Sequence, residues 1–308
     1  MSNSEGAMSV IEAALRRMGE GERLRLSDVG DRATVASFAI PPKYLLDAVR
    51  SIDQTDRARL WRRVSNHVNS PSALLTDRFV RWLLRRNQFM QVDSGTRQQI
   101  QDTYDRGFLR ALRLNQDATD RDLVSLLEDH GSALRKLITD ITGRAPRDVV
   151  SAEYSPSTQL MVLGLTMASL RGPILDIGCG EHALLVHHLR SAGLPAHGID
   201  RLTLNAMHAD WLTFEPGRDH WATITAHHSF TLHFSHHHHR ADGGETAAAY
   251  AEAFMRYLLA LEIGGTFAYA PSVPFFEAVL PRDRWQVRPT VRSVDGVTTT
   301  STHITRRY

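Results

Sequence analysis

The spacing of apolar residues changes once along the chain, and this change divides the sequence into two parts. From residue 9 to about residue 142, apolar residues recur at helical spacing, as in YLLDAVRSI, SALLTDRFVRWLLRR and LVSLLEDHGSALRKLITDI. Ser72, Asp93 and Thr119 stand where helices would begin, because their side chains can accept hydrogen bonds from free backbone N–H groups. Residues 1–150 are therefore predicted to form an all-helical domain of about five to seven helices.

After residue 150, short apolar runs alternate with helical segments. The runs are PILDIGCG, PAHGID, WATITAHHSF and GTFAYAPSV, and the helical segments include LLVHHLRSAG and AAAYAEAFMRYLLALE. Strands that alternate with helices predict a mostly parallel sheet covered on both faces. The tail, RWQVRPTVRS followed by TTTSTHITRRY, has the pattern of an antiparallel hairpin. Residues 151–308 are therefore predicted to form an α/β domain that ends in this hairpin.

The composition is that of a globular protein in a reducing compartment. The 308 residues are 42% hydrophobic, and 36 basic residues nearly balance 34 acidic ones, so charge gives no reason to expect a nucleic-acid partner. No secretory signal precedes the helical part, and no run approaches the about 18 apolar residues of a membrane span. The single Cys179 permits no internal disulfide and no CxxC site. We therefore expect a cytoplasmic protein.

A glycine loop follows the first strand of the α/β domain. The strand ends in Asp176, and Gly178 and Gly180 form a tight loop that allows a close approach of the backbone to a ligand. Asp200 ends the next strand 20 residues after Gly180, which is the spacing at which an acid reaches a nucleotide ribose. A further acid, Asp210, follows. Together these features predict a nucleotide-type cofactor site.

At these residues the sequence resembles the class I S-adenosylmethionine (SAM)-dependent methyltransferases, whose first strand carries the motif D/E-x-G-x-G. The resemblance covers residues 154–308 and implies a Rossmann-like SAM-binding sheet. It implies that the Gly178 and Gly180 backbone lines the amino-acid and ribose part of SAM and that Asp200 accepts the ribose hydroxyls. Asp210 and the Trp211 amide would then recognise adenine, and Asp176 would orient the loop or bind the amino group through water.

The glycine loop also distinguishes SAM from NAD as the expected cofactor. NAD-binding Rossmann proteins have G-x-G-x-x-G, but position 183 of this chain is alanine. Many class I methyltransferases carry a third glycine where this chain has Glu181-His182-Ala183. His182 would then either lie near the methionine end of the cofactor or cap the following helix and face solvent.

Seven histidines lie between Thr225 and Arg240, in TAHHSFTLHFSHHHHR. The resemblance makes WATITAHHSF the fourth strand of the sheet, whose carboxyl end faces the transferred group. His227 or His228 is therefore a candidate general base, since an unperturbed histidine titrates near about pH 6.5. The later histidines would form a helix start near the substrate pocket, a polar turn or a zinc site. We favour the helix start, because no third zinc ligand accompanies His233 and His236.

Aromatic residues at three predicted strand and helix ends complete the candidate site. Tyr154, Phe230 and Tyr269 would form a cage around the sulfonium, since a desolvated cation over aromatic faces gains about 2 kcal/mol. The candidate catalytic residues are His228, His227, Tyr269 and Tyr154, and the candidate cofactor-binding residues are Asp176, Gly178, Gly180, His182, Asp200, Arg201, Asp210, Trp211 and Phe230. No metal is expected.

The resemblance and the residues together favour a small-molecule methyltransferase of secondary metabolism, with S-adenosylhomocysteine as the second product. Nucleic-acid methylation is not expected, because the fourth strand does not end in an N/D-P-P-Y/F motif. The helical domain would act as a lid. The layout is also similar to enzymes that attack SAM at its aminobutyl carbon, such as azetidine-2-carboxylate synthases, which release methylthioadenosine. A non-catalytic SAM-binding domain is the third alternative.

Overall fold

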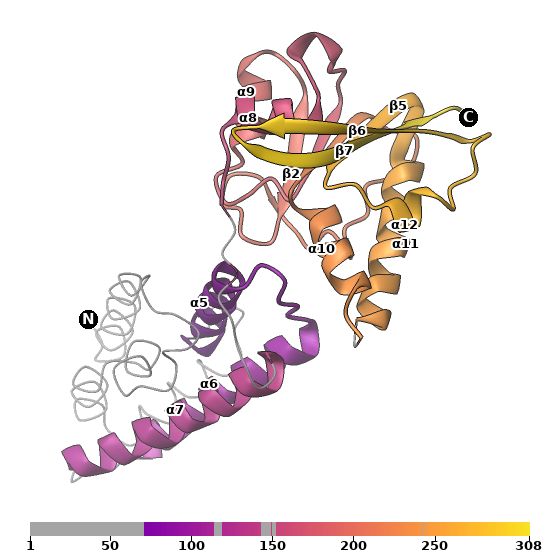
Figure 1. Cartoon of the computed structure of the whole chain (residues 1–308). Helices are drawn as coiled ribbons and strands as arrows, with labels where there is room; N and C mark the ends of the chain where they lie inside the picture. Colours follow the sequence, from indigo (N-terminus) through magenta and orange to yellow (C-terminus); the bar gives the residue numbers. More distant parts are fainter. Residues whose placement is uncertain (1–70, 114–118, 143–148, 150–151, 242) are drawn as a thin grey trace. The chain divides into compact units, whose positions relative to one another are not determined.

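The computed structural model describes residues 71–113, 119–142, 149, 152–241 and 243–308 (Figure 1). The chain divides into two units, Met1–Ser151 and Ala152–Tyr308. Within the described residues, no helix combines the length and the apolar character needed to cross a membrane.

The described part of the first unit is helical. Its helices are α5 (Pro71–Arg86), α6 (Ser94–Arg113) and α7 (Asp120–Thr142). The remaining helices predicted for residues 1–150 lie outside the described residues, so the cap or lid stays a prediction. The core of these three helices includes Leu75, Phe79, Trp82 and Leu83, whose spacing of four, three and one places them on one face of α5.

Two of the predicted helix starts are confirmed by hydrogen bonds. The Asp93 carboxylate accepts a bond from the backbone N–H of Thr96 at 2.7 Å, one residue before α6 begins. The Thr119 hydroxyl accepts a bond from the backbone N–H of Asp122 at 3.3 Å, and the Asp122 carboxylate bonds back to Thr119 N at 2.8 Å. This reciprocal pair is a capping box with aspartate as its acid. Helix α5 begins at Pro71, directly before the predicted Ser72.

The second unit is an α/β domain, as the sequence predicts. Its strands are β1 (Ile174–Ile177), β2 (Ala196–Asp200), β3 (Met207–His208), β4 (Trp221–His227), β5 (Leu261–Ala270), β6 (Trp285–Val294) and β7 (Val297–Arg306). Its helices are α8 (Pro156–Leu163), the 3-10 turn η3 (Met167–Ser169), α9 (Leu184–Ser191), α10 (Phe230–His238), α11 (Gly244–Ala260) and α12 (Pro274–Glu277).

The seven strands form one sheet in the order β3-β2-β1-β4-β5-β7-β6. Strands β1 to β5 are parallel to their neighbours, and β7 pairs antiparallel with both β5 and β6. The predicted C-terminal hairpin is therefore confirmed, and Figure 1 shows it as the two yellow strands. The chain runs outward from β1 in one direction through β2 and β3 and in the other through β4 and β5. Ligands bind outside the carboxyl ends of the strands at such a switch point, here between β1 and β4.

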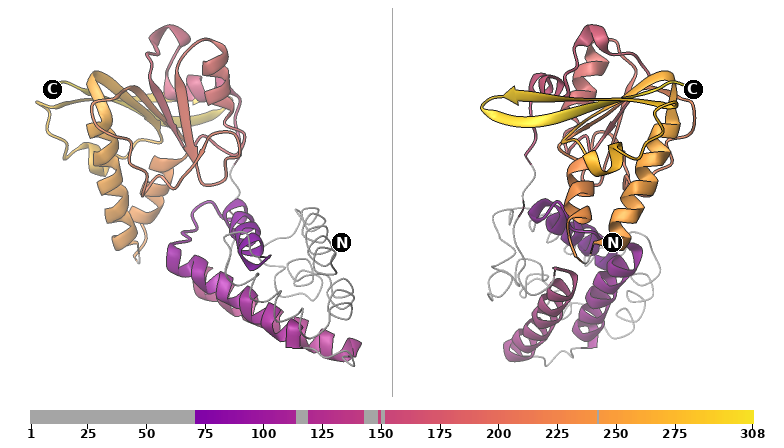
Figure 2. Two further views of the ribbon diagram at one scale, coloured as in Figure 1. Left: turned by 180° about the vertical axis from the view of Figure 1, so that it is seen from behind. Right: turned by 45° about the vertical axis from the view of Figure 1, so that its right-hand side comes forward.

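Helices cover both faces of the sheet, and each face has its own core. Helices α10 and α11, which run side by side in both views of Figure 2, pack on the face that carries Leu175 and Ile177 of β1. Helices α8 and α9 pack on the opposite face with Ile174. Because successive strand residues point to opposite faces, the short β1 is buried on both sides. The two cores hold the carboxyl ends of β1 and β4 in fixed positions.

Candidate cofactor-binding site

The loop after β1 needs glycine at two positions. Gly178 and Gly180 have φ values of 74° and 80°, in the left-handed region that side chains disfavour. A Cβ atom on Gly178 would overlap the Ser229 side chain and lie 3.2 Å from the Trp211 ring. Ser229, in the turn after β4, and Trp211, in the segment after β3, therefore both pack against the loop. This packing holds the loop backbone at the switch point of the sheet.

Asp200 lies at the end of β2 and anchors the glycine loop. Its carboxylate accepts hydrogen bonds from the backbone N–H of Gly180 at 3.2 Å and of Leu202 at 2.7 Å. Burial raises the pKa of Asp200, and the nearby charge of Glu153 adds to the increase, although both N–H bonds oppose it. The structure thus brings Asp200 to the glycine loop, where the resemblance puts the ribose hydroxyls.

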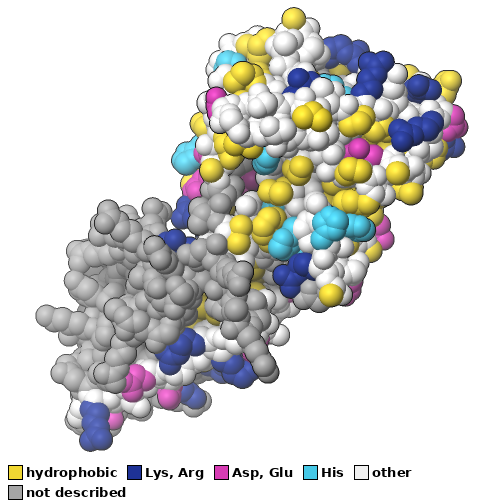
Figure 3. Space-filling model, in the orientation of Figure 1, with side chains coloured by type: hydrophobic (Ala, Val, Ile, Leu, Met, Phe, Trp, Pro, Cys, Tyr) yellow, Lys and Arg dark blue, Asp and Glu magenta, His cyan; other side chains and the backbone are white. Residues whose placement is uncertain are grey.

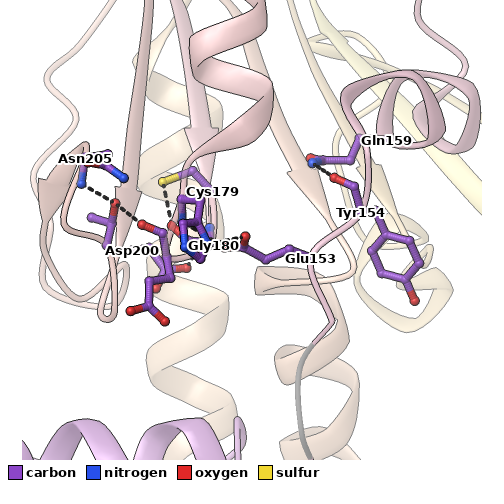
Figure 4. Close-up of polar contacts among 10 residues, drawn as sticks. Glu153, Tyr154, Gln159, Cys179, Gly180, Asp200 and Asn205 are labelled. Carbon is purple, nitrogen blue, oxygen red and sulfur yellow. Dashed lines mark hydrogen bonds and ion pairs between the residues drawn. The ribbon is translucent and has the colours of Figure 1, made fainter. Parts of the chain in front are cut away.

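Glu153 belongs to the same site, although no sequence pattern singles it out. Its carboxylate accepts a hydrogen bond from the backbone N–H of His182 at 2.9 Å and lies 2.7 Å from the Nδ1 atom of the His182 ring. A Cβ atom on Gly180 would lie only 2.5 Å from Glu153 Oε1. Figure 4 shows the Glu153 side chain pointing at Gly180. The carboxylate closes one side of the loop and holds the exposed His182.

Asp176 is the buried acid of the site. The side chain is 1% exposed, and its Oδ1 atom accepts a 2.7 Å hydrogen bond from the Thr225 hydroxyl of β4. The other oxygen, Oδ2, is buried and makes no hydrogen bond to any described residue. Burial, with a contribution from the Asp200 charge, raises the pKa of Asp176 to about 7. A buried carboxyl oxygen without a partner can accept a hydrogen bond from a ligand.

We expect Asp176→Asn to remove part of the pH dependence of stability. The folded pKa of about 7 exceeds the ordinary value of 3.8. The ionisation of Asp176 therefore lowers the free energy of unfolding of the wild type as pH rises between these values, by at most about 1.4 kcal/mol per pH unit. Asparagine carries no charge, so the free energy of unfolding of the variant minus that of the wild type should increase from pH 5 to pH 7. Urea unfolding at several pH values measures this difference, and a constant difference would contradict the assignment.

The predicted adenine end of the site contains Asp210, Trp211 and Arg201. Asp210 is half-buried, and its Oδ1 atom accepts a 2.8 Å bond from Leu212 N. The Trp211 ring is buried, and its Nε1 atom donates to the Tyr250 hydroxyl at 3.1 Å. The Arg201 guanidinium lies 4.8 Å from the centre of the Trp211 ring, in a cation–π contact. These contacts fix the segment after β3 beside the glycine loop.

Three aromatic rings meet at the carboxyl end of β4. The centre of the Tyr154 ring lies 5.0 Å from that of His227 and 6.2 Å from that of His228, and the two histidine rings are 4.7 Å apart. His228 has a φ value of 46°, which ends the strand, and its N–H donates to the Ala270 carbonyl at 2.8 Å. The structure thus brings together three of the four candidate catalytic residues.

The predicted aromatic cage does not form. Phe230 and Tyr269 are both 0% exposed and lie in the core under α10 and α11, where each contacts Phe254. The Tyr269 hydroxyl donates to the buried Glu277 carboxylate at 2.8 Å. Of the three predicted cage residues, only Tyr154 has exposed surface, at 43%. Phe230 and Tyr269 are packed among the core side chains, which leaves Tyr154 as the one cage candidate.

The later histidines belong to helix α10, which begins directly after Ser229. His233 and His237 lie on its buried face, while His238 and His239 are exposed. The His238 ring stacks on Phe275 with 3.7 Å between the ring centres. Figure 3 shows histidine side chains gathered on this surface of the unit. In the described part of the chain, no three His, Cys, Asp or Glu side chains are arranged to hold a metal ion.

The similarity of this chain to known proteins is low. No protein-family model and no curated protein matches the sequence. The chain is similar to the crystal structure of TrmN from Thermus thermophilus, with 15% identity and a TM-score of 0.36, over 63% of this chain and 69% of TrmN. It is also similar to the methyltransferase subunit of a type I restriction-modification system from Streptococcus thermophilus, with 14% identity and a TM-score of 0.29, over 98% of this chain and 84% of that subunit. Both TM-scores are below 0.5, so the functional assignment depends on the residues of the site.

Proposed function

We propose that the chain is a SAM-dependent methyltransferase that acts on a small molecule. The observation that carries this proposal is the concentration of three carboxyl groups, Glu153, Asp176 and Asp200, around the glycine loop. SAM carries a positive sulfonium and an ammonium group, which such a loop attracts. The diphosphate of NAD is negative, and the Glu153 carboxylate, which contacts the loop at Gly180 and His182, would repel it.

The residues of the site fit SAM in a simple arrangement. Asp200 would accept the ribose hydroxyls, the Gly178 and Gly180 backbone would lie along the amino-acid end, and Asp210 with the Trp211 amide would hold adenine. Bound SAM supplies a methyl group that is open to attack by a nucleophile. The chain contributes mainly position, since reacting groups held in line gain most of their rate from orientation.

His227 and His228 would take the proton that the acceptor loses. Both lie at the carboxyl end of β4, beside the glycine loop. Burial lowers the pKa of both rings, that of His227 to about 3 with a contribution from His228. Both histidines are therefore neutral near pH 7 and can accept a hydrogen bond; of the two, His228 is the better proton acceptor, because a pKa of about 3 makes His227 a weak base. In this proposal the acceptor is a small molecule of secondary metabolism and not a nucleic acid or a membrane lipid, in keeping with the balanced charge of the chain.

A second candidate function is attack at the aminobutyl carbon of SAM. The observation that favours it is the 2.7 Å contact between Glu153 and His182, because this pair lies beside Gly180, where the cofactor's amino group is expected. The pair would take the proton that this amine loses as its nitrogen bonds to the γ-carbon and methylthioadenosine leaves. Azetidine-2-carboxylate is the other product of that reaction.

One experiment separates these candidates. We would incubate the full chain with SAM alone and with a mixture of small hydroxyl and amine acceptors, and identify products by mass spectrometry. Methyl transfer predicts S-adenosylhomocysteine only when an acceptor is present. Methylthioadenosine with azetidine-2-carboxylate from SAM alone, above a control without protein, would instead establish the second function. Bound but unchanged SAM in every mixture would indicate a non-catalytic domain and contradict both proposals.

A further inference from the structure

The three rings at the end of β4 form a surface that the cofactor assignment does not use. We call Tyr154, His227 and His228 the ring wall. Its rings come from two elements, the segment before α8 and the carboxyl end of β4, and their centres are 4.7 to 6.2 Å apart. His227 meets the other two rings edge to face, at 72° and 65°, whereas the accessible rings of Tyr154 and His228 are inclined at 34° and can pack against a further ring. The ring wall therefore suits a flat ring more than a flexible chain.

Short connections join the ring wall to the glycine loop. Glu153, which contacts the loop at Gly180 and His182, is the residue directly before Tyr154, and consecutive Cα atoms are about 3.8 Å apart. Figure 4 shows their side chains pointing to different sides of the chain. Ser229, directly after His228, donates a 2.6 Å hydrogen bond to the Ile177 carbonyl at the end of β1. A molecule on the ring wall would thus lie next to the cofactor end that the loop holds.

His227 provides one specific polar atom in this wall. The residue is 9% exposed, and its Nε2 atom is buried and makes no hydrogen bond to any described residue. Because burial keeps the ring neutral, this nitrogen can act as a hydrogen-bond acceptor. A buried polar atom without a partner is unfavourable, and a donor on a ligand would supply the missing hydrogen bond. The left-handed backbone of His228 is a strained feature of the kind found at binding sites.

Acidic side chains predominate among the described residues around the glycine loop. Glu153 precedes Tyr154, and Asp176 and Asp200 lie at the ends of the neighbouring strands β1 and β2. Both histidines of the wall are neutral, and the Arg201 guanidinium is directed to the Trp211 ring. A carboxylate or phosphate on the bound molecule would lie near Glu153 and Asp200, and among the described residues Arg201, whose charge acts on Asp200, offsets only part of this repulsion.

We infer that the acceptor is a flat aromatic compound that presents a neutral O–H or N–H donor to His227 Nε2 and carries no negative charge. This inference rests on the proposed function, since it names the class of molecule that receives the methyl group. A phenol without an acidic substituent is the simplest compound of this class. The phenol oxygen would bond to the methyl carbon as the bond between that carbon and the SAM sulfur breaks and S-adenosylhomocysteine leaves, and the hydroxyl proton would pass to His228 or His227.

The test uses three phenols that differ mainly in charge: tyramine, 4-methylphenol and 4-hydroxyphenylacetate. Their binding to the full chain is measured by saturation-transfer NMR titration, with and without S-adenosylhomocysteine. Tyramine and 4-methylphenol should bind at least about tenfold more tightly than 4-hydroxyphenylacetate. Equal or tighter binding of the anionic phenol, or no binding of any of the three while S-adenosylhomocysteine binds, would overturn the inference. Phenol binding in a chain that does not bind S-adenosylhomocysteine would overturn the proposed function alone.

A substitution tests the role of the nitrogen atom itself. His227→Phe keeps a ring in the wall and removes Nε2, so 4-methylphenol should bind about tenfold more weakly while S-adenosylhomocysteine affinity stays the same. His188→Phe, the same exchange at an exposed position of α9, is the matched control and should change neither. Unchanged phenol affinity in His227→Phe would contradict the proposed contact. If this variant does not fold, the titrations of the wild type with the three phenols still test the preference for an uncharged or cationic acceptor.

Discussion

Replacing Asp200 with asparagine is expected to weaken binding of S-adenosylhomocysteine by about 100- to 1,000-fold. The carboxylate anchors the glycine loop through Gly180 N, and two of its lone-pair positions remain to accept hydrogen bonds from a ligand. An amide of the same size removes the charge and turns one acceptor into a donor. Hydrogen bonds to charged groups contribute about 1.5–3 kcal/mol each, so the loss of one bond and the weakening of the other would cost about 3–4 kcal/mol, which corresponds to this range.

The control for Asp200→Asn is the same exchange at Asp283. Asp283 is exposed in the turn before β6, far along the chain from the glycine loop, and its replacement should leave S-adenosylhomocysteine affinity unchanged. Titration calorimetry measures both variants, and thermal unfolding shows whether Asp200→Asn is folded. A folded Asp200→Asn protein that binds as tightly as the wild type would contradict the ribose assignment.

Gly178→Ala is expected to lower the free energy of unfolding by about 2–5 kcal/mol. The left-handed backbone costs an alanine about 1–2 kcal/mol, and the added Cβ atom must also displace Ser229, whose Oγ atom would be 2.8 Å away. Ser229 cannot move freely, because its hydroxyl is bonded to the Ile177 carbonyl. Any shift that relieves the overlap moves the loop, so S-adenosylhomocysteine affinity should fall as well.

Gly193→Ala separates backbone strain from crowding. Gly193 has a similar φ value, 82°, but a Cβ atom there would have no neighbour within 4 Å. Its replacement should cost only about 1–2 kcal/mol and leave ligand affinity unchanged. Urea unfolding of the two variants compares these costs directly. If both substitutions were equally destabilising, the close contact between Ser229 and the loop would play no part in the stability of the site.

The order of elements in the second unit could be predicted from the sequence, because hydrophobic period and glycine position specify it locally. The same patterns predicted the glycine loop, the anchoring acid Asp200 and the final hairpin. Strand β3 could not be predicted, since its two residues, Met207 and His208, are both exposed and show no alternation. Glu153 could not be predicted for a related reason. Its contact with His182 joins residues 29 apart in the sequence, and no local pattern indicates this contact.

The segment after β4 shows how classing histidine as polar misleads a sequence pattern. The buried residues of α10 include Phe230, His233, Phe234 and His237, which is a regular helical spacing with histidine at two of the buried positions. Counting only apolar residues hides this period. The predicted fourth strand ran to Phe230. In the structure, β4 ends at His227, because His228 adopts a left-handed conformation. Phe230 then turns into the core, which explains why the predicted cage is absent.

The most direct test of the account is a calorimetric titration of the full chain with S-adenosylhomocysteine and, separately, with NAD. The glycine loop predicts binding of one S-adenosylhomocysteine per chain and no binding of NAD, because the Glu153 carboxylate contacts the loop where NAD would place its diphosphate. Binding of NAD, or the absence of S-adenosylhomocysteine binding by a folded protein, would contradict the central claim that this site holds SAM.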